Sequence, residues 1–98
     1  MKTIVWKPGL TLTLDADESE IYSWDWTDWL DGETLVNPPQ IIADAGITAS
    51  LYYLGADYVD VRIEGGSAGN TYAVTVRATS STHARRRDRT VLFAIATL

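Results

Sequence analysis

The sequence predicts an all-β fold: a two-sheet antiparallel sandwich of about seven strands, in a single domain that spans residues 1–98. Apolar and polar side chains alternate in several segments, which is the pattern of strands that bury one face. Turn-forming residues separate these segments at a spacing of about 8–12 residues, which is typical of sandwiches. No segment has the apolar periodicity of a long helix.

The first third of the chain supplies an aromatic strand. Residues 1–9 are expected to form an N-terminal arm or an edge strand, and Leu10–Leu14 alternates leucine with threonine. Tyr22, Trp24 and Trp26 alternate with small or charged residues, so all three rings are expected on the core face. This strand should contribute much of the apolar surface that the fold buries.

One short helical turn is expected after this strand, over Asp28–Asp31, with Thr27 as its cap and its two apolar residues turned inward. Glu33–Val36 is a weak strand candidate, as is Ile4–Trp6. The chain from Asn37 to Ala45 carries turn signals and gives no clear strand.

The second half supplies the remaining strands. Ile47, Ala49, Leu51 and Tyr53 are predicted to share the core face of one strand. Alternation also predicts strands over Val59–Ile63 and Tyr72–Ala78, and the final strand is expected over Thr90–Leu98. A sandwich of these elements needs no disulfide, and the sequence contains no cysteine.

The net charge of −5 is unevenly distributed along the chain. Residues 1–60 hold two lysines and eleven acidic residues, whereas residues 61–98 hold six arginines and two acidic residues. The acidic total argues against nucleic acid as a partner, and no apolar run is long enough to suggest a membrane segment or a secretory signal. A soluble protein made in a cytoplasm is expected.

Catalytic, cofactor and metal sites are not expected. His83 lies in a polar stretch that predicts an exposed hairpin loop, with no nucleophile motif near it in sequence. The acid-rich segment Asp15–Glu20 lacks the glycine and the final glutamate of a helix-loop-helix calcium site, which leaves a solvated connector or a weak calcium site between loops. We therefore predict that the protein is not an enzyme.

Two features are candidates for protein interfaces. Trp29 would anchor a partner if it projects from its short turn, because tryptophan is enriched among interface hot spots. Arg85, Arg86, Arg87 and Arg89 form a basic tip, which is either a solvated loop that discourages edge pairing or a docking point for an acidic surface. In an assembly of several copies, that surface could belong to a neighbouring copy.

Two segments carry a resemblance to a known family. Ile21–Leu30, followed by Asp31–Leu35, resembles the opening strand and turn of small tailed-bacteriophage virion proteins of the fibre-tail adaptor type. Ile63–Val76 is similar to a Gly-Gly-x-x-Gly-x-x-Tyr-x-Val-x-Val stretch that these proteins share with immunoglobulin-like domains, where the tyrosine lies at a strand-entry corner. Asn37–Ala45 has no counterpart in this pattern.

The resemblance implies an immunoglobulin-like sandwich that serves as a structural part of the virion, present in several copies and without an active site. Its expected partners are tail, neck, portal or fibre proteins. The alternatives are a carbohydrate- or receptor-binding sandwich that uses exposed tryptophans, and a bacterial structural module unrelated to phage.

Overall fold

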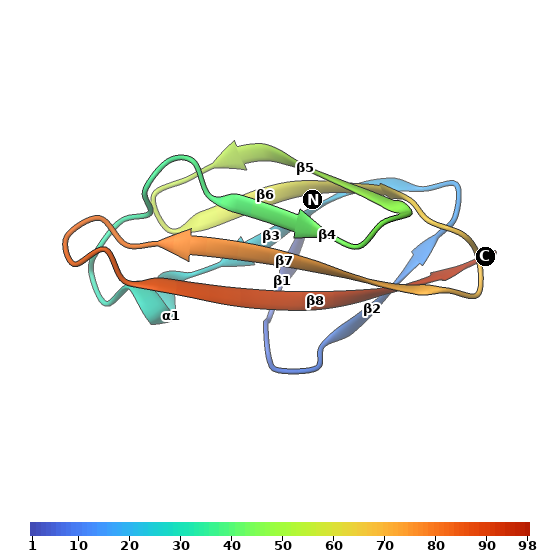
Figure 1. Ribbon diagram of the computed structural model, residues 1–98, viewed down its shortest axis with the longest axis horizontal. Helices are drawn as coiled ribbons and strands as arrows, with labels where there is room; N and C mark the ends of the chain where they lie inside the picture. Colours follow the sequence, from blue (N-terminus) through green and yellow to red (C-terminus); the bar gives the residue numbers. More distant parts are fainter.

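Eight strands form two four-stranded sheets that pack face to face, and the computed structural model describes all of residues 1–98 (Figure 1). In chain order the elements are β1 (Lys2–Ile4), β2 (Thr11–Asp15), β3 (Ser19–Asp25), α1 (Thr27–Leu30), β4 (Gln40–Ala43), β5 (Ile47–Leu54), β6 (Tyr58–Gly65), β7 (Thr71–Thr79) and β8 (Arg86–Ala96). The all-β two-sheet sandwich predicted from the sequence is confirmed.

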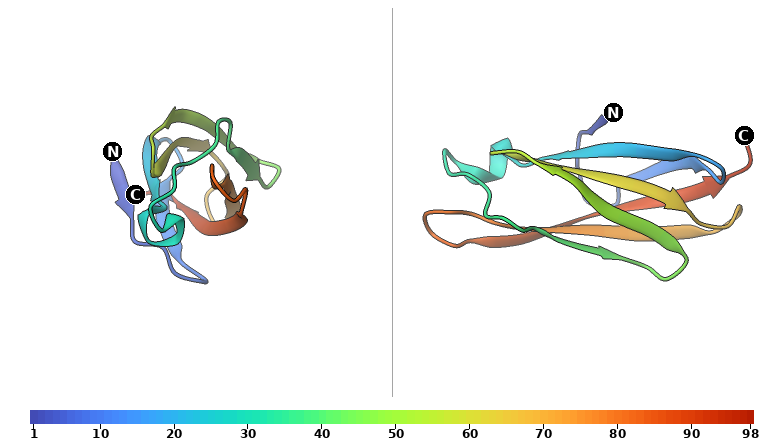
Figure 2. Two further views of the ribbon diagram at one scale, coloured as in Figure 1. Left: turned by 90° about the vertical axis from the view of Figure 1, so that its left-hand side faces the viewer. Right: turned by 90° about the horizontal axis from the view of Figure 1, so that it is seen from above.

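The strand order is β1-β3-β6-β5 in the first sheet and β2-β8-β7-β4 in the second. The sheets are mixed and not purely antiparallel as predicted, because β1 runs parallel to β3 and β2 runs parallel to β8. The chain crosses from the first sheet to the second between β1 and β2, so the N-terminal residues take part in both layers (Figure 2). The sole helix, α1, is a single turn and far too short to span a membrane.

The core consists of inward-facing side chains from both sheets, as the alternation predicted. Tyr22, Trp24 and Trp26 are only 0–2% exposed. The Phe93 ring from β8 lies 5.1 Å from that of Tyr22 and 6.5 Å from that of Trp24, centroid to centroid. The indole N–H of Trp24 donates a hydrogen bond to the main-chain oxygen of Arg89 at 3.3 Å, which satisfies its polar group inside the core. The tryptophan-rich strand is therefore a structural element.

Three strands differ between the prediction and the structure, in extent or in presence. The last strand begins at Arg86 and not at Thr90, because residues 86–89 pair with residues 76–79 of β7. The unpredicted strand β4 lies at Gln40–Ala43, where no alternation marked it. The predicted strand over Glu33–Val36 is reduced to one isolated bridge between Leu35 and Ser80.

Two predicted core positions of strand β5 are exposed: Leu51, which is 40% exposed, and Tyr53, which follows an irregularity in the strand. The register against β6 shifts between Leu51 and Tyr53, so Tyr53 pairs with Asp60 on the outer face. Tyr53 is 56% exposed, whereas the sequence placed it in the core. A single extra residue moves every later side chain to the opposite face, and alternation alone does not reveal such a bulge.

The helical turn also differs in detail. It runs over Thr27–Leu30, so Thr27 is its first residue and not its cap. The Thr27 hydroxyl instead lies 2.6 Å from a carboxylate oxygen of Asp25 and 3.0 Å from one of Asp57. Leu30 is buried, as predicted, and anchors the turn to the core at one end of the sandwich.

The corner before β7 is held by Tyr72. Its hydroxyl accepts hydrogen bonds from the main-chain N–H of Ser67 at 3.0 Å and from the side-chain amide of Asn70 at 3.5 Å. These donors, the main-chain one first, lower the pKa of Tyr72 below its usual value because they favour the charged form. The predicted strand-entry position of this tyrosine is the position it occupies.

Candidate interaction surface

Trp29 does not project freely from α1. Its ring packs edge-on against the buried Trp26 ring, with 5.4 Å between centroids, and the Arg85 guanidinium lies over it at 4.7 Å from its centroid. One side of the indole is thus covered by the core and another by a cation, so the residue is half-buried. Trp29 fastens the helical turn to the rest of the domain.

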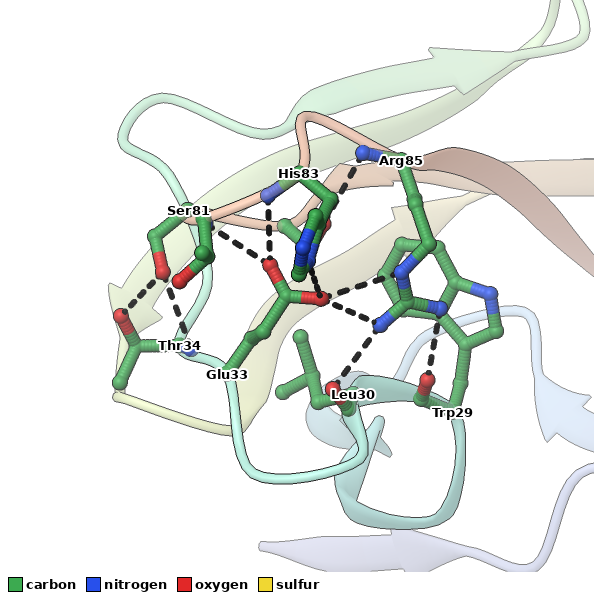
Figure 3. A network of polar contacts seen from close by, with 9 residues as sticks. Trp29, Leu30, Glu33, Thr34, Ser81, His83 and Arg85 are labelled. Carbon is green, nitrogen blue, oxygen red and sulfur yellow. Dashed lines mark hydrogen bonds and ion pairs between the residues drawn. The ribbon is translucent and has the colours of Figure 1, made fainter.

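Arg85 is the centre of a polar network that joins α1 to the β7–β8 connection (Figure 3). Its guanidinium donates to the Glu33 carboxylate at 2.8 and 3.1 Å. It also donates to the main-chain oxygens of Trp29 and Leu30 at 3.1 and 2.9 Å. These carbonyls belong to the last turn of a helix, where they lack partners within the helix. Arg85 therefore caps α1 from a segment more than fifty residues away.

Glu33 completes this network from the other side. Its second carboxylate oxygen accepts the main-chain N–H groups of Thr82 and His83 at 2.8 and 2.9 Å. The hydrogen bond from Arg85, followed by that from the N–H of His83, lowers the pKa of Glu33 from 4.5 to about 2. The His83 ring itself is exposed, in the predicted hairpin loop, with its Nδ1 3.5 Å from Glu33.

Arg89 is buried, although it belongs to the segment predicted as a basic tip. It is 6% exposed, and its guanidinium lies 4.6 Å from the Trp26 ring centroid and 5.1 Å from that of Trp6. It donates to the main-chain oxygen of Asp25 at 3.0 Å and to the Asp28 carboxylate at 3.3 Å. Its Nε has no hydrogen-bond partner. Two indole rings and the hydrogen bonds to Asp25 and Asp28 hold the Arg89 guanidinium in place.

Arg86 and Arg87 are the two members of the arginine segment that face solvent without an ion pair. They are the first residues of β8, opposite Thr79 and Ala78 of β7. The neighbouring acid, Asp88, is already engaged by Arg77 through contacts of 2.7 and 3.0 Å. The arginine segment thus divides into two side chains bound within the domain and two that remain open to a partner.

A polar groove that sequence reasoning did not anticipate runs between β1, α1 and the turn before β6. It comprises a recess of about 380 Å³ beside Trp6, Asp28 and Arg89, and one of about 220 Å³ beside Asp57 and Tyr58. The recesses are contiguous, because Thr3, Asp25 and Thr27 line both. No motif marks this groove, since its residues come from four separate segments of the chain.

The structure gives neither a sugar-stacking surface nor a metal site at the other residues that the sequence suggested. Trp24 and Trp26 have no exposed surface with which to stack on a sugar ring. In the acid-rich segment, Glu18 and Glu20 lie about 4 Å from Lys2. No group of three His, Cys, Asp or Glu side chains is arranged to hold a metal ion.

Comparison with known proteins gives one family. The family model described as podophage GP4 fiber-tail adaptor protein gp77 matches residues 14–94. No curated protein matches the chain. Among solved structures, the solution structure of Amebosin aligns at 12% identity with a TM-score of 0.45, over 89% of each chain, which is too distant to bear on fold or function.

Proposed function

The chain belongs to the podophage GP4 fiber-tail adaptor family of gp77, and from this premise we propose that it is a non-enzymatic virion component that links tail and fibre proteins. The family match carries the proposal. It runs from the end of β2 to near the end of β8 and so includes most of both sheets. Synthesis in the host cytoplasm and assembly into the virion in several copies follow from this role.

Arg86 and Arg87 are the residues that we assign to partner contact. They are exposed and free of internal ion pairs, so docking of either side chain on an acidic surface breaks no contact within the domain, and as neighbours on a strand they point to opposite faces of the second sheet. The other two arginines of the segment, Arg85 and Arg89, are held by contacts with Trp29 and Trp26 within the domain. Charged groups at the edge of an interface chiefly set association rate and specificity.

The test uses phage particles produced without this chain, to which purified protein is added back. R86Q/R87Q is compared with the matched control K2Q/K7Q, which removes the same amount of charge from exposed lysines elsewhere. We expect the arginine variant to bind particles more weakly and with a smaller salt dependence, while the lysine variant binds as the parent does. Equal binding by all three proteins would remove Arg86 and Arg87 from the interface. Failure of the parent protein to bind, or to restore fibres, would contradict the adaptor role.

A further inference from the structure

Asp60 is a buried carboxylate without an adequate partner. It is 2% exposed, and its Oδ1 makes no hydrogen bond. Because its neighbours Val59 and Val61 face the core, Asp60 faces outward from the first sheet. A buried, unpaired carboxylate is costly, and such groups are usually paired or hydrogen-bonded. The cost of burying this carboxylate points to a role for Asp60 on the outer face of the sheet.

Asp60 lies beside the smaller recess of the groove. In the β3–β6 register it is directly opposite Ser23, and Ser23 is opposite Thr3 of β1. Both Ser23 and Thr3 line that recess, as does Tyr58, which precedes Asp60 by two residues and shares its face of β6. Burial, followed by the negative charges of neighbours that include Asp60 and Asp57, raises the pKa of Tyr58.

Two other carboxylates, those of Asp25 and Asp57, line the smaller recess itself. Asp25 and Asp57 both approach the Thr27 hydroxyl, at 2.6 and 3.0 Å. The hydroxyl has one proton and donates to one acceptor at a time, and the main-chain N–H of Thr27 donates to Asp25 at 3.0 Å, so the other oxygens of the pair can accept further donors. Asp25, Asp57 and Asp60 take part in no ion pair. The nearest cation on the groove wall, Arg89, is already paired with Asp28.

The larger recess contains a hydrogen-bond donor that lacks an acceptor. Arg89 lines it, is almost fully buried and has an unpartnered Nε donor. A ligand that completes the groove therefore presents a positive charge to the carboxylates of Asp25 and Asp57 and an oxygen acceptor near Arg89. The recess of about 220 Å³ is smaller than the roughly 300–1,000 Å³ of pockets that hold drug-sized ligands, which suits a single side chain.

We propose that this groove binds a basic peptide segment of a partner virion protein, with an arginine or lysine side chain in the recess lined by Asp25 and Asp57, next to Asp60, and main-chain oxygens of the segment facing Arg89. The proposal rests on the adaptor function and identifies the chemistry of one partner contact.

The binding test is an NMR titration of the isotope-labelled chain with the blocked peptide acetyl-Gly-Arg-Gly-amide, its lysine counterpart and its glutamate counterpart. The basic peptides are expected to cause saturable amide shifts at Thr3, Asp25 and Thr27. The D25N/D57N variant should bind at least about tenfold more weakly, because charge-assisted hydrogen bonds are lost. The matched control D15N/D17N removes the same charge from the β2–β3 turn and should bind as the parent does.

A separate variant distinguishes a binding role from a structural one. D60N removes the buried charge, so it should unfold at the same or a higher denaturant concentration than the parent while binding the arginine peptide more weakly. The proposal is overturned if D60N is less stable and binds normally, or if D25N/D57N binds as tightly as D15N/D17N. It is also overturned if the glutamate peptide binds equally well, or if calcium chloride shifts these amides and the basic peptides do not. These outcomes need no phage particles, so they leave the adaptor function standing on its own test.

Discussion

Replacement of Arg89 tests how a cation is held between two indoles. The R89A variant loses two cation–π contacts, each about 1–2 kcal/mol when partly desolvated, and a charge-assisted hydrogen bond of about 1.5–3 kcal/mol to the main-chain oxygen of Asp25. Part of this loss is offset, because the guanidinium no longer has to leave water on folding. We expect a net destabilisation of about 2–4 kcal/mol.

Two companion variants separate the contributions. R89M keeps an unbranched stem between Trp6 and Trp26 and should lose about half as much stability as R89A, roughly 1–2 kcal/mol. The Asp28 side chain is 77% exposed and its carboxylate returns easily to solvent, so D28N should cost at most about 1 kcal/mol. The expected order of destabilisation is R89A, then R89M, then D28N.

Urea unfolding followed by circular dichroism of the β-sheet backbone measures all three free energies. Thermal unfolding gives a second measure, with a drop of roughly 10–25 °C expected for R89A in a domain of this size. If D28N proves as destabilising as R89A, the ion pair and not the indole sandwich holds Arg89, and the reasoning is refuted.

Two other predictions concern the corners of the fold. The pKa of Glu33 is lowered from 4.5 to about 2, so the contribution of its charge to stability is complete above pH 4.5 and is lost as the pH falls toward 2. The difference in unfolding free energy between the parent and E33Q, measured by urea unfolding, should therefore shrink to zero over that range. A difference that stays constant with pH would contradict this prediction. Gly66 has φ +85° and an added Cβ would meet Ile95 at 2.8 Å, so G66A should cost roughly 2–4 kcal/mol in the same assay. Gly32 is the control, with φ +87° and open space around it: G32A should cost only the backbone strain of about 1–2 kcal/mol, and equal losses would show that crowding at Ile95 is unimportant.

The sequence predicted the parts of the fold that depend on local pattern. Strict alternation placed Tyr22, Trp24 and Trp26 in the core because a strand has a period of two residues, whatever its partners. The same rule failed at Tyr53, where a bulge that depends on pairing with β6 reversed the face. Strand β4 escaped prediction because its isoleucines are adjacent and do not alternate.

The candidate site was harder to predict because its contacts join distant segments. The four arginines look alike in sequence, yet Arg85 finds Glu33 and Arg89 finds two indoles, which are partners that only the folded chain brings near. The groove beside Asp25, Asp57 and Asp60 left no sequence signal for the same reason. The alternation of apolar residues predicts which side chains are buried. It does not predict which polar groups contact one another in the folded chain.

The parallel pairing of β2 with β8 has a mechanical consequence. Five consecutive positions, from Thr11 opposite Leu92 to Asp15 opposite Ala96, join a strand near one chain end to the strand at the other. Tension that draws the two ends apart pulls these strands in opposite directions along their common axis. The hydrogen bonds between them then bear the load together and do not open one after another, as they do when a hairpin is unzipped. A domain connected in this way resists stretching along the line through its ends.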